Sequence, residues 1–123
     1  VWDIARERLV QYLNKGENVI FDATFTNGKE RRAFIKFARD NGAEKVQGLF
    51  ITTPPEIAKE RNKKRVRTIP EYAIDRMAEQ LRRNPPATED GFDSVFDIDE
   101  FGNLIRGELT DSQKIITKEF KIR

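Results

Sequence analysis

The sequence predicts an α/β fold with a parallel, doubly wound sheet. Apolar stretches of strand length alternate along the chain with stretches of helical periodicity, and the links between them are short. The content of 36% charged and 37% hydrophobic residues is also typical of a soluble globular domain. At 123 residues the chain is at most one domain, and it is short for a complete nucleotide-binding domain of this class.

The first part of the chain predicts helix, strand and helix. Residues 2–13 carry an amphipathic helical pattern, and residues 18–21 form a continuous apolar run, which is typical of a strand covered on both faces. The next helix begins near Asn27, which has capping-box spacing to Glu30. The apolar stripes of the two helices are Trp2, Ala5, Leu9, Tyr12 and Leu13, and then Ala33, Phe34, Phe37 and Ala38.

The pattern continues with a second strand and two further helices. Residues 45–51 predict a strand, and Thr53 is expected to cap a third helix in which Pro54 takes the first helical position. A fourth helix begins at Pro70 and ends at Asn84. The residues expected to be buried are Val46, Leu49, Phe50 and Ile51 in the strand and Ala73, Ile74, Met77 and Leu81 in the fourth helix.

The last third of the chain carries shorter signals. Residues 89–93 predict a turn with a buried aromatic side chain, and residues 94–98 predict a short strand. Residues 101–103 predict a hairpin turn into residues 104–105, and residues 114–122 fit either a strand or a short helix.

The composition excludes several kinds of chemistry. The chain has no cysteine and no histidine, so disulfides, thiolate zinc sites, cysteine nucleophiles and serine–histidine triads are absent. Proton transfer would use carboxylates or lysine, and a bound metal would be a hard cation on oxygen ligands. No 18-residue apolar run and no signal-peptide pattern occur, so we expect a cytoplasmic protein without a membrane partner.

Asp22 and Thr24 are the first candidate site residues. They follow the predicted strand at residues 18–21 directly, and the carboxyl ends of parallel strands are where α/β sheets bind ligands. Phosphoryl-transfer enzymes place a carboxylate beside magnesium or a hydroxyl acceptor in this way. The alternative is that Asp22 only accepts backbone hydrogen bonds within its own loop.

A basic segment at residues 59–67 is the second candidate. It holds six lysines and arginines, and Arg61 and Arg65 are four residues apart, so they would share one helical face and reach the same phosphate group. The alternative is a solvated helix end that complements the helix dipole. Because residues 66–70 break the helix, a mobile lid over residues 59–70 is expected.

A Walker A phosphate loop is absent from the sequence. The only Gly-Lys pair is Gly28-Lys29, with Ala23 in place of the first glycine and Glu30 in place of Ser or Thr. The chain begins with Val1 within an amphipathic pattern, which leads us to expect a missing upstream segment, although a cleaved precursor would look the same.

Together these motifs resemble the later part of the P-loop polynucleotide kinases, which phosphorylate 5′-hydroxyl ends of RNA or DNA. The resemblance covers about residues 4–98, in the family's order and spacing. The matching stretches are Val19–Thr24 followed by a basic helix, Lys59–Arg65 followed by Ile69–Pro70, and Pro85–Pro86 leading to Glu89–Asp93.

The resemblance implies a three-layer, parallel-sheet P-loop kinase-like fold that is incomplete at the amino terminus. Residues 1–98 would form the partial kinase domain, and residues 99–123 would form a carboxyl-terminal extension. ATP and Mg²⁺ would need the missing segment, which would also hold the acidic general base, and the chain alone is then expected to be inactive.

The resemblance also implies roles for the candidate residues. Asp22 and Thr24 would bind the acceptor, a 5′ nucleic-acid end, while Arg61 and Arg65 would bind the nucleotide phosphates and act in catalysis. Phe25 departs from the asparagine often found after the Asp-x-Thr motif, so the acceptor stays open.

Three further functions remain open at this point. The chain could be part of a small-molecule P-loop kinase, or a non-catalytic module that binds nucleic acid through residues 59–67. A third interpretation is that a free sheet edge pairs with a missing amino-terminal segment or with a second copy in a homo-oligomer.

Overall fold

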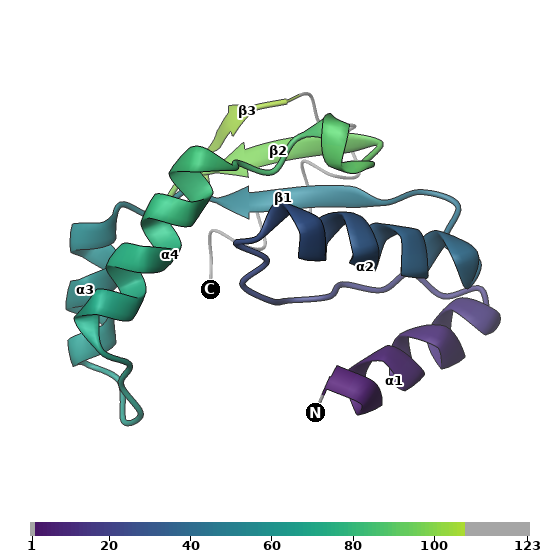
Figure 1. Cartoon of the computed structure of the whole chain (residues 1–123), viewed down its shortest axis with the longest axis horizontal. Helices are drawn as coiled ribbons and strands as arrows, with labels where there is room; N and C mark the ends of the chain where they lie inside the picture. The colour runs from purple at the N-terminus through teal and green to yellow at the C-terminus, as the bar shows by residue number, and fades with distance from the viewer. Residues whose placement is uncertain (1, 108–123) are drawn as a thin grey trace.

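The computed structural model describes residues 2–107, and in this part the chain forms four α-helices and one three-stranded sheet (Figure 1). The alternation of helices and strands predicted from the sequence is confirmed from the second helix onward. The elements are α1 (Trp2–Asn14), α2 (Gly28–Asp40), β1 (Gln47–Ile51), α3 (Pro55–Lys63), α4 (Glu71–Arg83), a 3₁₀ turn (Thr88–Asp90), β2 (Ser94–Ile98) and β3 (Leu104–Arg106).

The sheet has the order β1-β2-β3 and is mixed. β1 and β2 are parallel, with Gln47 opposite Ser94 and Ile51 opposite Ile98, and the connection between them runs through α3 and α4. β3 is antiparallel to β2, as the predicted hairpin requires, so the predicted parallel pairing is observed for β1 and β2 only. The reason is local, because the tight turn after Asp99 can only reverse the chain.

Residues 18–21 do not form the predicted strand. Their backbone pairs with no strand in the part of the chain that the structure describes, and Ile20 is 77% exposed, so this segment is not covered on both faces. The aromatic side chains pack with one another instead: the ring of Phe21 stacks on Trp2 at 5.9 Å between centroids and lies 4.4 Å from that of Phe34. The apolar side chain of Phe21 is thus packed against residues of α1 and α2 rather than within a sheet.

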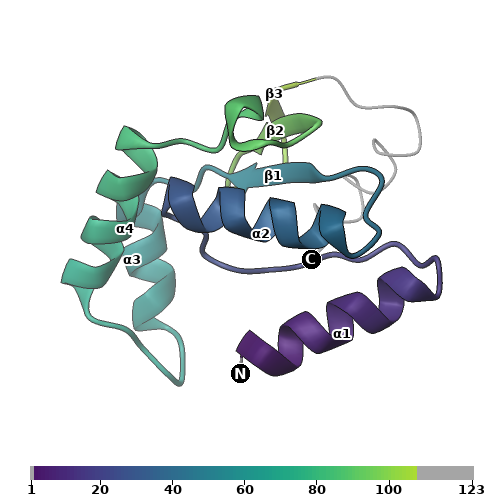
Figure 2. The same cartoon turned by 45° about the vertical axis from the view of Figure 1, so that its right-hand side comes forward.

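One face of β1 is open within the described residues, although Phe96 and Ile98, the neighbouring residues of β2 on that face, are buried. Figure 1 and Figure 2 both show α2 running beside β1, while the opposite face of β1 exposes 45% of Leu49 and 54% of Ile51. The predicted burial of these two side chains is therefore wrong, and a third layer is not observed over residues 2–107. The buried apolar core consists of Leu9, Ile35, Ala38, Ile74, Val95, Phe96 and Ile98.

The two predicted helix caps have different outcomes. Asn27 caps α2 as predicted, since its side-chain oxygen accepts hydrogen bonds from the backbone N–H groups of Lys29 at 2.8 Å and Glu30 at 3.4 Å. Thr53 does not cap α3, because Pro54 is the capping residue and makes no side-chain hydrogen bond. A residue that precedes proline is driven into extended backbone, so the helix cannot begin before Pro55.

The remaining predictions concern the later part of the chain. The strand at residues 94–98, the hairpin into residues 104–105 and the turn before Phe92 are confirmed. The element predicted at residues 114–122 lies outside the described residues. Among the helices of the described region, none has the length and apolar character needed to span a bilayer.

Asp93 joins the starts of the two parallel strands and gives a pH prediction. Its carboxylate accepts hydrogen bonds from the backbone N–H of Val46 at 2.7 Å and from Arg39 at 3.0 Å, and these hold its pKa below the ordinary value. A lowered pKa stabilises the fold above the ordinary value, and this stabilisation is lost as pH falls through the lowered value. We expect D93N to have a lower urea midpoint than wild type near pH 7, with the difference disappearing below about pH 4.

The control for this measurement is E44Q, which changes an exposed carboxylate that makes no hydrogen bond within residues 2–107. E44Q should track wild type at every pH. A D93N difference that stays constant down to pH 2 would contradict the assignment.

Candidate functional site

The helical hairpin α3–α4 lies at the carboxyl edge of the parallel strands. Both β1 and β2 point toward it in Figure 1. At this edge the backbone N–H of Thr52 donates to the carbonyl of Ile98 at 2.8 Å, so the strands stay paired up to the point where β1 leaves the sheet. In open α/β sheets this edge is where ligands bind.

Asp22 and Thr24 lie in the loop between α1 and α2, and both are exposed. We call residues 22–27 the acceptor loop, after the role that the resemblance implies for Asp22 and Thr24. It leads into the amino end of α2, which lies near the carboxyl end of β1 in both views (Figures 1 and 2). The prediction that Asp22 lies at the end of a strand is therefore wrong, because the residues before it form an extended loop.

Arg61 and Arg65 belong to the hairpin, and both are exposed. Arg61 is in the last turn of α3 and donates to the backbone carbonyl of Glu100 at 3.3 Å, which joins α3 to the β2–β3 turn. Arg65 lies beyond the end of α3, so the two arginines do not share one helical face as predicted. Within residues 2–107 no hydrogen bond or ion pair connects either arginine to Asp22 or Thr24.

The basic segment at residues 59–67 divides into paired and unpaired charges. The ammonium group of Lys59 lies 2.8 Å from Asp75, and that of Lys63 lies 3.1 Å from Glu60; in each case the carboxylate hydrogen bond raises the pKa of the lysine. The exposed Lys64, Arg65 and Arg67 have no ion pair within the described region. The alternative of a solvated helix end with neutralised charges therefore fits Lys59 and Lys63. It does not fit the tip of the hairpin, which carries the three unpaired cations.

Asn62 fixes the turn that carries this tip. It is buried, its amide nitrogen donates to the carbonyl of Ile69 at 2.7 Å, and its amide oxygen accepts from the N–H of Ile69 at 3.0 Å. These two bonds close the chain over residues 63–68, between the end of α3 and the start of α4. The sequence analysis missed Asn62, since a single asparagine among lysines and arginines looks like a surface residue.

Removing these two bonds should open the turn. We expect N62A to accelerate trypsin cleavage after the basic residues at 63–67 by about 30-fold, because two lost buried hydrogen bonds cost about 2 kcal/mol of local opening free energy. The measurement is limited proteolysis with the cleavage sites identified by mass spectrometry.

Q47A is the matched control, because Gln47 also makes one amide hydrogen bond, to Ser94 at 3.3 Å, but at the sheet surface. It should leave the cleavage rate unchanged. Equal rates for wild type and N62A would show that the turn is open in solution regardless of Asn62.

Arg31 is the other residue that the sequence analysis missed. Its side chain lies on the buried face of α2 with Ile35 and Ala38, and it is only 3% exposed. A charged residue four positions before a buried isoleucine, inside an apolar stripe, was the available signal. The predicted stripe member Ala33 is exposed instead.

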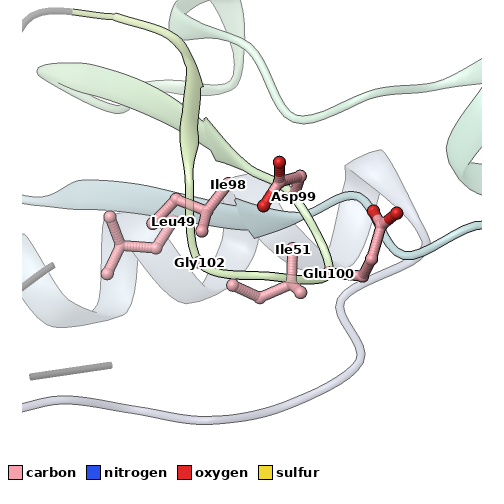
Figure 3. A pocket seen from close by; sticks show the side chains of 6 residues that line it. All are labelled: Leu49, Ile51, Ile98, Asp99, Glu100 and Gly102. Carbon is pink, nitrogen blue, oxygen red and sulfur yellow. The ribbon is translucent and has the colours of Figure 1, made fainter. Parts of the chain in front are cut away.

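A shallow hollow of about 150 Å³ lies on the open face of β1, beside the turn that follows β2. Figure 3 shows Leu49, Ile51 and Ile98 lining it from β1 and β2, with Asp99 and Glu100 from the following turn. The backbone N–H groups of Phe101 and Asn103 both donate to the Asp99 carboxylate, which shapes this turn. The hollow is continuous with the exposed apolar face described above.

The acidic side chains of the described residues are dispersed over the fold. Within residues 2–107 no group of three or more acidic side chains gathers at a distance suited to a metal ion.

A scan against protein-family models matches residues 1–84 to the AAA domain. The chain belongs to this AAA-domain family. The matched region contains the acceptor loop and the whole α3–α4 hairpin, and it supports a nucleotide-binding, P-loop NTPase-like kinase character. A search of curated proteins gave no match to the chain.

Proposed function

We propose that this chain contributes the acceptor and lid sides of an ATP-dependent kinase, whose acceptor is the 5′-hydroxyl end of a polynucleotide. The observation that carries the proposal is the α3–α4 hairpin, which stands at the carboxyl edge of β1 and β2 and bears three unpaired cations in the turn at its outer end, while the acceptor loop approaches the same edge (Figure 1). The family supports the kinase character, while the polynucleotide acceptor rests on the resemblance of the motifs.

In this proposal Asp22 and Thr24 bind the acceptor. The carboxylate accepts and the threonine hydroxyl donates or accepts hydrogen bonds, which suits the hydroxyl-bearing end of a sugar. Both side chains are exposed and can reach such a ligand without a change of the loop. Their task is orientation of the attacking hydroxyl, which is a large part of catalysis in phosphoryl transfer.

Arg65, assisted by Arg61, would bind the phosphates. When bound, ATP and Mg²⁺ supply the transferable γ-phosphoryl group and part of the charge neutralisation. The acceptor oxygen forms a bond to the γ-phosphorus while the bond to the bridging oxygen breaks, and the hydroxyl proton passes to a carboxylate base. Since the sequence has no Walker A motif, the phosphate loop would come from polypeptide outside these 123 residues.

The test is transfer of labelled γ-phosphate by the natural protein to a 5′-hydroxyl oligonucleotide. An otherwise identical 5′-phosphate oligonucleotide is the control, because its acceptor is blocked. We expect labelling of the 5′-hydroxyl oligonucleotide alone, and its loss in D22A and T24A. Labelling of a small hydroxylated metabolite, with none of the oligonucleotide, would assign the chain to a small-molecule kinase.

A second function is favoured by the three unpaired cations at the hairpin tip. A module that only binds nucleic acid would use Lys64, Arg65 and Arg67 as phosphate contacts, and its affinity would fall steeply with salt. In the triple variant K64A/R65A/R67A, the number of counterions released on binding a single strand should then be lower by about two. This number is obtained from the salt dependence of the affinity. The double variant K59A/K63A, which removes paired lysines, is the control and should have a smaller effect.

A further inference from the structure

Arg31 joins three separate segments of the chain through one buried guanidinium group. Its Nη1 donates to the carbonyl of Phe25 at 2.8 Å, its Nη2 donates to the carbonyl of Asn84 at 2.7 Å, and its Nε donates to the carboxylate of Asp90 at 2.9 Å. Phe25 belongs to the acceptor loop, Asn84 caps the end of α4, and Asp90 lies in the 3₁₀ turn before β2.

The geometry suits arginine and no other side chain. A guanidinium presents its N–H groups in a fixed planar fork, so three acceptors in three directions are satisfied without further rearrangement. A lysine at this position would carry the same charge on one flexible point and could not hold all three acceptors. The burial of Arg31 therefore fixes the relative positions of its three partners.

The contact with Phe25 is at an unusual point of the backbone. Phe25 has φ of 41°, the only positive value for a non-glycine residue within the described region, and a bulky side chain rarely adopts it. Its carbonyl is bound by Arg31, and its ring lies 5.0 Å from that of Phe34 and 6.4 Å from that of Trp2. This conformation directly follows Thr24 and sets the direction in which the acceptor loop enters α2.

The contact with Asn84 connects the same guanidinium to the basic hairpin. Asn84 ends α4, and α4 packs against α3, whose last turn holds Arg61. Within residues 2–107 no hydrogen bond or ion pair joins Asp22 or Thr24 directly to Arg61 or Arg65. Arg31 connects the acceptor loop to the end of α4 through the carbonyls of Phe25 and Asn84.

We propose that Arg31 is a positioning residue: by binding Phe25 and Asn84 at once, it sets the acceptor loop at a fixed place relative to the α3–α4 hairpin. Its consequence for ligand binding rests on the proposed function. Without Arg31 the loop would be released at Phe25, while the helices and the basic tip would remain.

The experiment compares R31K with R32K in the full chain. Arg32 is the adjacent residue, it is exposed, and its only hydrogen bond or ion pair within residues 2–107 is a longer one of 3.4 Å to Asp90. Far-UV circular dichroism checks the helices. Fluorescence of Trp2, the single tryptophan, reports on the loop, because its ring contacts Phe21 and Phe25.

We expect R31K to keep the helical spectrum, to shift Trp2 emission to the red and to make it more accessible to acrylamide. In R31K the affinity for a 3′-fluorescein, 5′-hydroxyl single-stranded oligonucleotide, divided by the affinity for its 5′-phosphate counterpart, should be about 10-fold lower than in wild type. This is the change expected for a lost contact of about 1.4 kcal/mol. Binding through the basic tip, measured from the salt dependence, should not change. R32K should behave as wild type.

The outcomes separate the two proposals. If wild type does not prefer the 5′-hydroxyl end, the proposed function fails, and the Trp2 signal alone then decides whether Arg31 holds the loop. If R31K has the Trp2 emission of wild type, or if R32K changes it equally, the positioning role is wrong. Should R31K not fold, the double variant R31M/D90N, which buries no charge, carries the same measurements.

Discussion

R65A is expected to reduce the turnover of phosphoryl transfer by about 1,000-fold, the loss typical of an arginine that stabilises the charge of a transferring phosphoryl group. Arg65 is exposed at the turn after α3, and Asn62 closes the turn around it. Because this contact would be made in the transition state, the KM for the acceptor should change much less than kcat. Steady-state kinetics of the natural protein with a 5′-hydroxyl oligonucleotide measures both.

Two controls make this result specific. R65K keeps the charge but loses the planar fork, so it should recover only a small part of the rate. R67A removes an equally exposed cation from the same turn and should stay within a few fold of wild type. If R65A retained a third or more of the wild-type turnover, Arg65 would have no part in the chemical step.

The elements that could be predicted from the sequence are those whose signals are local. The Asn27 cap of α2 depends on residues within one turn of it, and the hairpin after Asp99 depends on a short turn. Helix α4 likewise follows its own apolar periodicity, with Ile74 buried. These predictions needed no knowledge of the rest of the chain.

The predictions that failed depended on distant neighbours. Residues 18–21 have strand-forming side chains, but a strand also needs a partner, and Phe21 finds Trp2 and Phe34 instead. Leu49 and Ile51 were assigned to the core because they are apolar, yet burial requires a layer over that face of the sheet. Asp22 was predicted to lie at the end of the strand at residues 18–21, and that prediction failed because these residues have no partner strand within the described residues.

The candidate site was predicted only at its exposed residues. Asp22, Thr24, Arg61 and Arg65 were found from motifs, and their roles remain proposals. The buried polar residues that organise the site, Arg31 and Asn62, escaped because all their partners except the Asp90 carboxylate are backbone carbonyls and amides of Phe25, Asn84 and Ile69. Backbone partners leave no residue-type signature in a sequence.

D90A is expected to cost about 3–5 kcal/mol of the free energy of unfolding, the range for removing one partner of a buried ion pair. The Asp90 side chain is 8% exposed and that of Arg31 is 2% exposed, so the guanidinium would stay buried without its counter-charge. Asp90 also accepts from the backbone N–H of Ala87 at 3.2 Å, which would lose its partner as well. Urea denaturation followed by circular dichroism measures the loss.

E79A is the matched control, since it removes a carboxylate with equally short contacts at the surface. Hydrogen bonds from Arg82 and Arg83 lower the pKa of Glu79 to about 2, but solvent screens these exposed pairs. Its urea midpoint should stay close to that of wild type despite the lowered pKa of Glu79. The comparison separates the effect of burial from that of ion pairing as such.

The double variant R31M/D90A should be less destabilised than the sum of its two single variants, because it leaves no buried charge unpaired. It should not regain the full stability of wild type, since the carbonyls of Phe25 and Asn84 would still lack their donor. Strict additivity of the single variants would mean that Arg31 and Asp90 do not interact in solution. A double variant as stable as wild type would instead mean that the two carbonyls find water, and that Arg31 contributes geometry to the acceptor loop rather than stability to the fold.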